Sequence, residues 1–257
     1  MEFEIKKYDS ENGKIYAIFK DVNSAFLNAL RKYILSEVPT MAIDEVTFYK
    51  NNTGMYDEMI ALRLGLIPLK SDIDSYLLPE KCDCPDKNCA RCSVEVFVKK
   101  KGPGVLYAKD LEFTDPAVKP VFPDMEIVKL DQDQEIEFTG YVRLGKGKVH
   151  AKHSPGFCYY RHLAKITVNN DKSLNKEEIS KYCPKKVFDS NLKVINLEEC
   201  DLCNKCVELS DNKIVVEPIE DQFFFYLESF GQLTIKRILK EAIQKLNEDL
   251  DNFSDLF

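Results

Sequence analysis

Apolar and polar residues alternate along several segments of the chain in the pattern of β-strands. Residues 3–8 and 14–19 flank Asn12-Gly13, a dipeptide that tolerates the positive φ of a tight turn, and they are predicted to form a hairpin. Residues 94–99 and 136–144 alternate in the same way, with apolar side chains on one face and mainly charged or hydroxyl-bearing ones on the other. This period of two predicts half-buried antiparallel strands in the middle of the chain.

An early segment has the period of an amphipathic helix instead. Asp21 is predicted to cap this helix and Pro39 to end it. Its apolar stripe consists of Val22, Ala25, Phe26, Ala29, Leu30, Tyr33 and Ile34. Asn28, Arg31 and Leu35 lie on the opposite side of the helix, which is either an ordinary solvated face or a second contact surface.

The last segment is predicted to form a longer helix that begins after Gly231. Its apolar residues recur at spacings close to those of a heptad seam and are Ile235, Leu239, Ala242, Leu246, Leu250 and Phe253. About 22 residues at ~1.5 Å each give a rod of roughly 33 Å, which is longer than the mean helix. The seam either packs wholly within its own domain or docks against a helix of a partner.

The composition is that of a globular protein. Of the 257 residues, 44% are hydrophobic and 31% are charged, which is enough for a sizeable core. The net charge of −7 disfavours a stand-alone nucleic-acid binder, because an acidic surface repels phosphate backbones. The sequence offers no apolar run of the ~20 residues that span a bilayer and no secretory signal, so we expect a cytoplasmic protein that does not enter the membrane. In that reducing compartment, the nine cysteines are expected to bind metal rather than to form disulfides.

The first cysteine group has the spacing Cys82-x-Cys84-x4-Cys89-x2-Cys92 in loop 82–92. Four thiolates at this spacing, with turn-forming proline, aspartate and asparagine between them, can complete a tetrahedral shell around one zinc ion. Buried cysteines without a ligand are the alternative, but the charged neighbours of this group disfavour burial. Because the protein supplies all of the ligands, the predicted site is structural rather than catalytic.

The second cysteine group lies in segment 169–213, which is polar, rich in lysine and poor in large apolar residues. It combines Cys183-Pro184 with Cys200-x2-Cys203-x2-Cys206, the arrangement of ferredoxin cluster loops. This spacing predicts one iron–sulfur cluster, and zinc is the competing metal because it also accepts four thiolates. A segment with so few apolar side chains is expected to need the metal to fold.

Four blocks of the sequence resemble the signatures of a known family. They are NALRKYILSEVPTMAIDEV at residues 28–46, DEMIALRLGLIPL at 57–69, HAKHSPG at 150–156 and ESFGQ at 228–232. Together they resemble the alpha-like subunits of multisubunit RNA polymerases, and most of all the archaeal D subunits. The blocks run from the first predicted helix to the last, so the resemblance covers almost the whole chain.

The resemblance implies an α+β fold with an alpha-like dimerisation domain built from both chain ends, an inserted mainly β domain and a small ferredoxin-like iron–sulfur insertion. By this resemblance the dimerisation domain comprises residues 1–46, 157–168 and 214–257, the insert domain residues 47–156, and the cluster insertion residues 169–213. A 4Fe–4S cluster on Cys183, Cys200, Cys203 and Cys206 is favoured. A 3Fe–4S form on three of these cysteines is the alternative, because the cluster type differs among archaeal relatives.

The resemblance also implies protein partners. The C-terminal helix would pack on the small alpha-like subunit L, and the early helix, through Asn28, Arg31 and Leu35, would contact a large polymerase subunit. Direct DNA binding is not implied.

The resemblance implies a non-catalytic assembly subunit of DNA-directed RNA polymerase. In keeping with this, no nucleophile–base pair and no phosphate-binding loop can be identified in the sequence. A ferredoxin-like electron-transfer protein is the alternative, and a zinc-containing nucleic-acid binder is a third hypothesis. An electron carrier does not need the long apolar seam, and a nucleic-acid binder should be basic.

Overall fold

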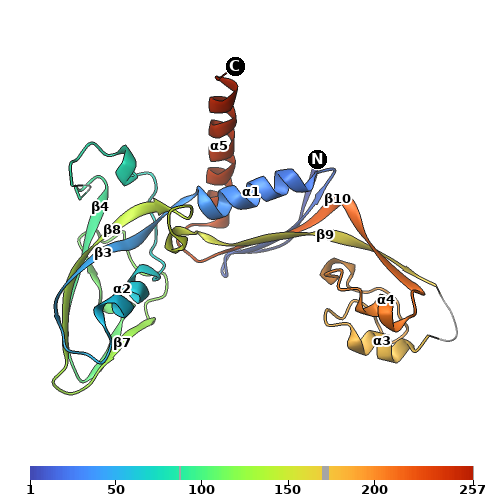
Figure 1. Cartoon of the computed structure of the whole chain (residues 1–257), viewed down its shortest axis with the longest axis horizontal. Helices are drawn as coiled ribbons and strands as arrows, with labels where there is room; N and C mark the ends of the chain where they lie inside the picture. The colour runs from blue at the N-terminus through green and yellow to red at the C-terminus, as the bar shows by residue number, and fades with distance from the viewer. Residues whose placement is uncertain (87, 170–173, 257) are drawn as a thin grey trace. The chain divides into compact units, whose positions relative to one another are not determined.

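The computed structural model describes residues 1–86, 88–169 and 174–256. They form two compact units, one of residues 1–9, 14–29 and 158–227 and the other of residues 10–13, 30–157 and 228–257 (Figure 1). Helices and antiparallel sheets are mixed along the chain, which confirms the expected α+β class. None of the helices within these ranges has the length and apolar character needed to cross a membrane.

A four-stranded sheet of order β1-β2-β10-β9 organises the first unit. β1 (Glu2–Asp9) and β2 (Lys14–Lys20) form the predicted hairpin, in which Gly13 has a positive φ of 61°. β9 (Gly156–Val168) and β10 (Ile214–Ser229) come from the second half of the chain. β10 is a continuous strand of 16 residues, and its apolar residues 223–227 are buried.

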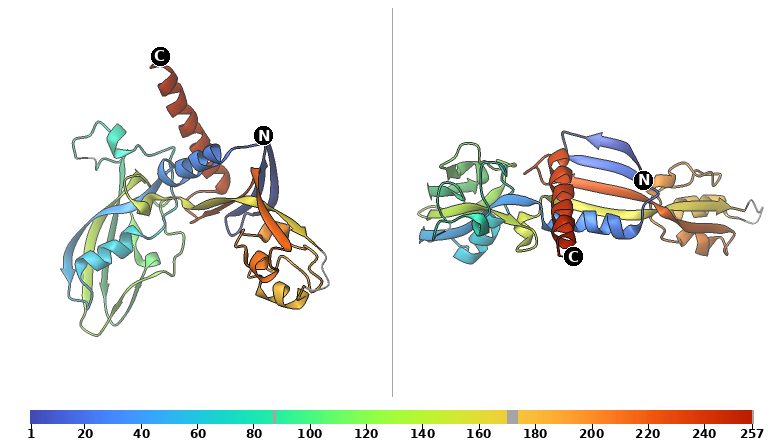
Figure 2. Two further views of the ribbon diagram at one scale, coloured as in Figure 1. Left: turned by 45° about the vertical axis from the view of Figure 1, so that its right-hand side comes forward. Right: turned by 90° about the horizontal axis from the view of Figure 1, so that it is seen from above.

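The segment between β9 and β10 folds as a small module. It contains α3 (Lys176–Tyr182), η4 (Leu197–Glu199) and α4 (Lys205–Leu209), drawn in gold and orange in Figure 2. Ile179, Val187, Phe188 and Leu192 are at most 4% exposed and cluster with Ala164 of β9 and Ile214 of β10. The expectation that this segment lacks apolar residues for a core is therefore wrong in part, because the flanking strands complete a small one.

The second unit contains a four-stranded sheet of order β3-β8-β4-β6. The strands are β3 (Pro39–Asn51), β4 (Ser93–Lys101), β6 (Glu112–Phe113) and β8 (Glu135–Lys146). The predicted alternation is confirmed, since Val94, Val96 and Val98 are buried while Glu95 and Phe97 are exposed.

Further elements contribute to the core of this unit. They are α2 (Asp57–Gly65), the paired strands β5 (Gly104–Tyr107) and β7 (Glu126–Leu130), and the short helices η1 (Pro79–Lys81), η2 (Ala108–Asp110) and η3 (Ala151–His153). Ile60 and Leu64 of α2, Leu106 of β5 and Ile127 of β7 are fully buried in the same cluster as the sheet residues.

Helix α1 (Ser24–Ser36) begins later than predicted. The cap is Asn23, whose side chain accepts a hydrogen bond from the Phe26 N–H at 2.8 Å. Asp21 instead adopts a positive φ of 53° in the preceding turn, so its assignment as the cap is wrong. The buried stripe is also rotated relative to the prediction, because Leu27, Leu30 and Ile34 are buried and Ala25 is exposed.

The predicted C-terminal helix is α5 (Ile235–Ser254), which is 20 residues long and is capped by the Thr234 hydroxyl. Its burial changes along its length. Ile235, Ile238 and Ala242 are at most 3% exposed, whereas Leu250 is 56% and Phe253 is 61% exposed. The apolar seam of the helix is therefore covered over its first two turns and uncovered towards its end.

Candidate metal centres and assembly surfaces

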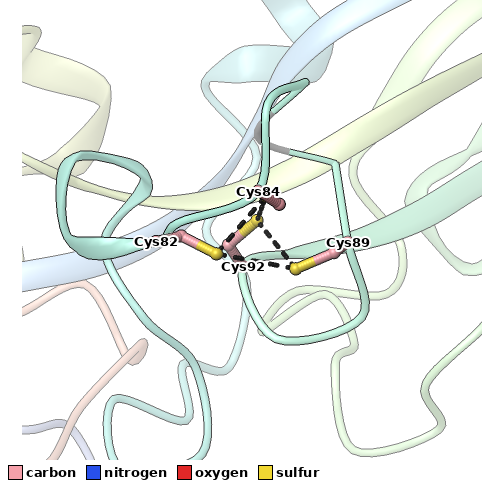
Figure 3. A group of neighbouring side chains, drawn as sticks. All are labelled: Cys82, Cys84, Cys89 and Cys92. Carbon is pink, nitrogen blue, oxygen red and sulfur yellow. Dashed lines mark hydrogen bonds between the residues drawn. The ribbon is translucent and has the colours of Figure 1, made fainter.

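The first cysteine group converges on one point in the second unit (Figure 3). The Sγ–Sγ distances are 3.4 Å for Cys82–Cys84, 3.5 Å for Cys82–Cys89 and Cys84–Cys92, and 3.6 Å for Cys89–Cys92. A tetrahedral ion with metal–sulfur bonds of about 2.3 Å has ligand edges of about 3.8 Å, close to these distances. The residues present therefore fit a single ion that is bound by four thiolates.

Backbone N–H groups favour the thiolate form of two of these cysteines. A hydrogen bond from the Arg91 N–H lowers the pKa of Cys89 to about 6, and one from the Cys89 N–H lowers the pKa of Cys84. Burial has the opposite effect and raises the pKa of Cys92 to about 12. Because the thiolate is the form that binds metal, a cation would offset the cost of ionising this buried sulfur.

The second cysteine group lines one cavity in the first unit. Cys183, Cys200, Cys203 and Cys206 all line it, together with Val187 and Phe188. Cys200 is buried and Cys203 is exposed, so the cavity reaches the surface at Cys203. Within the described residues, the tight grouping of ligand atoms seen in the first group is not repeated here.

The surroundings of this cavity are suited to thiolates in part. The Val187 N–H donates a hydrogen bond to the Cys183 Sγ at 3.4 Å. Burial raises the pKa of Cys200 and raises that of Cys206 to about 11, and the neighbouring cysteine sulfurs act in the same direction. Four thiols that share one cavity fit a polynuclear cluster, whose ligands stand farther apart than those of a single ion.

Arg161 of β9 connects the second cysteine group to the sheet of the first unit. Its guanidinium donates hydrogen bonds to the carbonyl of Glu198 at 2.5 Å and to the carbonyl of Cys200. The same guanidinium lies 4.4 Å from the ring centroid of Phe224 on β10. Lys6 of β1 adds an ion pair with Glu198 at 2.9 Å. The loop that leads into Cys200 is thus attached to β9 through Arg161 and to β1 through Lys6.

Comparison with known proteins identifies the family. The chain is 38% identical over 264 residues to DNA-directed RNA polymerase subunit Rpo3 of Methanosphaera stadtmanae, a match that covers 98% of this chain and 97% of that protein. Subunit Rpo3 of Pyrococcus horikoshii is 36% identical over 254 residues, which covers 97% of this chain and 96% of its own. The chain belongs to the archaeal Rpo3 family. The resemblance to alpha-like subunits, expected from the signature blocks, is confirmed.

The Rpo3 family fixes the general role of the chain. Residues 43–158 also match the model of the RNA polymerase Rpb3/RpoA insert domain. Rpo3 proteins are subunits of a nucleotidyltransferase complex and not its catalytic chains, so the expected non-catalytic role in RNA polymerase is confirmed. The alternative of a free-standing redox protein receives no support from these relatives.

The residues predicted to bind partner subunits lie on α1 and α5 of this Rpo3-family chain. On α1, Asn28, Arg31 and Leu35 are all half-buried. Arg31 and Asn28 take part in interactions within the chain. On α5, Leu239 and Leu246 are half-buried and Leu250 and Phe253 are exposed. The exposed part of the seam is therefore its last two turns.

Helix α2 carries a second apolar surface that the sequence analysis did not identify. Tyr56, Met59, Leu62 and Leu66 are 49% to 81% exposed and lie on one face, because their spacings are 3, 3 and 4 residues. The opposite residues Ile60 and Leu64 are buried. This spacing is visible in the sequence, but only the fold shows which of the two apolar faces is covered.

Proposed function

We propose that the chain is an assembly platform of archaeal RNA polymerase that pairs with the small alpha-like subunit L through α5. The observation that carries this proposal is the uncovered end of the α5 seam, where Leu250 and Phe253 are exposed and Ile243 is 47% exposed. Apolar side chains at heptad spacing on a helix that its own unit does not cover are typical of helix–helix interfaces.

The test is co-purification of the full chain with subunit L after substitution of the exposed seam. The double variant L250D/F253D should lose pairing, because two carboxylates would be buried in the interface, while its fold should stay intact. K240A, on an exposed position of the same helix, is the matched control. Full pairing by L250D/F253D would contradict the proposal.

The early helix and the domain division belong to the same proposal. We assign Asn28, Arg31 and Leu35 to contacts with a large polymerase subunit, for which the partial burial of Leu35 leaves apolar surface available.

The proposed domain division has a dimerisation domain of residues 1–46, 157–168 and 214–257 and an insert domain of residues 47–156. It is supported by the family match at residues 43–158. The compact units separate near residues 29, 157 and 227 instead, so residues 30–46 and 228–257 belong to the same unit as the proposed insert domain.

For the metal centres, we propose structural zinc at Cys82, Cys84, Cys89 and Cys92. The support is the near-tetrahedral arrangement of the sulfurs and the absence of an open ligand position once four thiolates are bound. Elemental analysis of freshly purified reduced protein should give about one zinc per chain at this group, and Cys89→Ser should lose it. Zinc content that is unchanged by Cys89→Ser would contradict the assignment.

We further propose one iron–sulfur cluster at Cys183, Cys200, Cys203 and Cys206, with 4Fe–4S favoured over 3Fe–4S. The support is the common cavity, the Cys-x2-Cys-x2-Cys spacing and the small module that encloses it. A cluster at this site would close the loop from residue 183 to residue 206. Anaerobic purification followed by iron and sulfide analysis and electron paramagnetic resonance distinguishes the two cluster types from zinc.

A further inference from the structure

Arg143 of β8 is buried although the strand pattern places it on the outer face. It alternates with Val142 and Leu144, which lie in the core, and shares its face with Thr139, which is exposed. Arg143 itself is only 7% exposed. A buried arginine on the outer face of a sheet means that another part of the chain covers it, and here that part is the loop of the first cysteine group.

The guanidinium of Arg143 joins the loop to the sheet. It donates hydrogen bonds to Asp44 Oδ2 at 2.8 Å and to Glu45 Oε2 at 2.9 Å, both on β3. It also donates to the side-chain carbonyl of Asn88, the residue directly before Cys89. Asp44 is held in turn by Lys152, whose ammonium lies 2.7 Å from Oδ1. The planar guanidinium can serve three acceptors at once, which a lysine ammonium cannot do in this geometry.

The two arms of the cysteine loop are fixed in different ways. The Cys89–Cys92 turn is closed by hydrogen bonds from the Cys92 and Ser93 N–H groups to the Cys89 carbonyl, at 2.9 and 3.0 Å. Ser93 is the first residue of β4 and pairs with Arg143 across the sheet. The contact between Arg143 and Asn88 extends this attachment to the arm that runs from Cys84 to Cys89.

We propose that Arg143 is a positioning residue for the first metal site, which it serves by holding Asn88 so that Cys89 stays in its ligating position. This inference rests on the metal site proposed above. Residues that orient metal ligands without touching the metal typically change metal affinity by about 10- to 100-fold when they are removed. The hydrogen bond between Arg143 and Asn88 should therefore make metal release slower than it would be from the four thiolates alone.

The test measures zinc release from the zinc-loaded full chain into excess chelator, with zinc per chain determined at timed intervals. Cys89→Ser defines the background from the other cysteines. Asn88→Ala removes the acceptor for Arg143 while leaving Asp44 and Glu45 paired. Asn88→Asp retains an acceptor oxygen for Arg143. Asp86→Ala is the matched control, because it places alanine at an exposed residue of the same loop.

We expect Asn88→Ala to release zinc about tenfold faster than the wild type, and Asn88→Asp and Asp86→Ala to remain within about threefold of it. Rescue by Asn88→Asp separates a specific contact with Arg143 from a general loosening of the loop. Release by Asn88→Ala within about threefold of the wild type, or equally fast release by Asn88→Asp, would overturn the inference. A wild-type chain that takes up no zinc above the Cys89→Ser background would instead overturn the metal site itself.

Discussion

The phenol of Tyr33 on α1 donates a hydrogen bond to Asp249 Oδ2 on α5, at 2.6 Å, across 216 residues of sequence. Both residues belong to the second compact unit. The contact joins the end of α1 to the part of α5 where the apolar seam becomes exposed. It therefore steadies the portion of α5 that is proposed to meet subunit L.

Replacing Tyr33 with phenylalanine should change the response of stability to alkaline pH. The hydrogen bond to Asp249 raises the pKa of Tyr33 to about 12, above the ~10 of a free tyrosine. Since the folded state holds the phenolic proton more tightly, this contribution to stability is complete below about pH 10 and is lost as the pH rises through about 12. Urea unfolding at a series of alkaline pH values should show a smaller loss for Tyr33→Phe. Parallel losses in both proteins would contradict the linkage.

Charged substitutions along α5 should have graded effects on the stability of the isolated chain. Ile238→Asp places a carboxylate at a position that is 0% exposed and should lower the free energy of unfolding by more than about 3 kcal/mol. Leu250→Asp lies at a position that is 56% exposed and should change it by about 0.5 kcal/mol or less. Denaturant unfolding monitored by circular dichroism measures both values. Similar losses would show that the end of α5 is covered in the free chain.

Cys203→Ser should loosen the cysteine-bearing loop without unfolding the whole module. Ile179 and Phe188 remain in the small core when the proposed cluster is absent, so α3 should keep its protection from hydrogen exchange. Residues 197–209 should exchange faster, because the metal bonds that order them are missing. Protection lost equally over α3 and this loop would show that the cluster, not the core, holds the module together.

Cys203→Ser also tests whether the role of the proposed cluster is structural rather than catalytic. Nucleotide addition per assembled polymerase should be equal for cluster-loaded and cluster-free enzyme under anaerobic conditions, because catalysis is assigned to other subunits. A large loss of turnover at equal assembly would require a redox or catalytic role for the cluster.

Arg161→Gln should accelerate the loss of iron from the proposed cluster. The variant removes the guanidinium that binds the carbonyls of Glu198 and Cys200 and lies over Phe224, so the loop before Cys200 loses its attachment to β9. Lys6→Gln is the control, because it removes only the surface ion pairs with Glu4 and Glu198, and such pairs contribute little to stability. The decay of the cluster absorbance in the presence of a chelator measures the difference. Equal decay of both variants would contradict a positioning role for Arg161.

The sequence pattern predicts those features that depend on residues close together in the sequence. The hairpin at Asn12-Gly13, the valine alternation of β4 and the convergence of the Cys82 group all follow from short-range spacing, and the structure contains each of them. The cap of α1 was missed because both Asp21 and Asn23 are suitable cap residues, and the path of the chain decides between them.

Long-range packing explains what the patterns could not predict. The burial of Arg143 depends on a loop more than 50 residues away in the sequence, as its contact with Asn88 shows. The exposed face of α2 and the rotated stripe of α1 likewise depend on which neighbours cover them. The core of the module between β9 and β10 could not be predicted from its own segment, because it also contains Ala164 of β9 and Ile214 of β10.

The strand order β1-β2-β10-β9 has a consequence for biosynthesis. The hairpin of β1 and β2 is made well before its neighbour β10, which begins only at Ile214. The core around β3, β4 and β8 lies wholly between residues 41 and 144, so it can fold while the ribosome is still adding later segments. The nascent hairpin therefore has one edge unpaired until then, and the sheet of the first unit is complete only after β10 has been made.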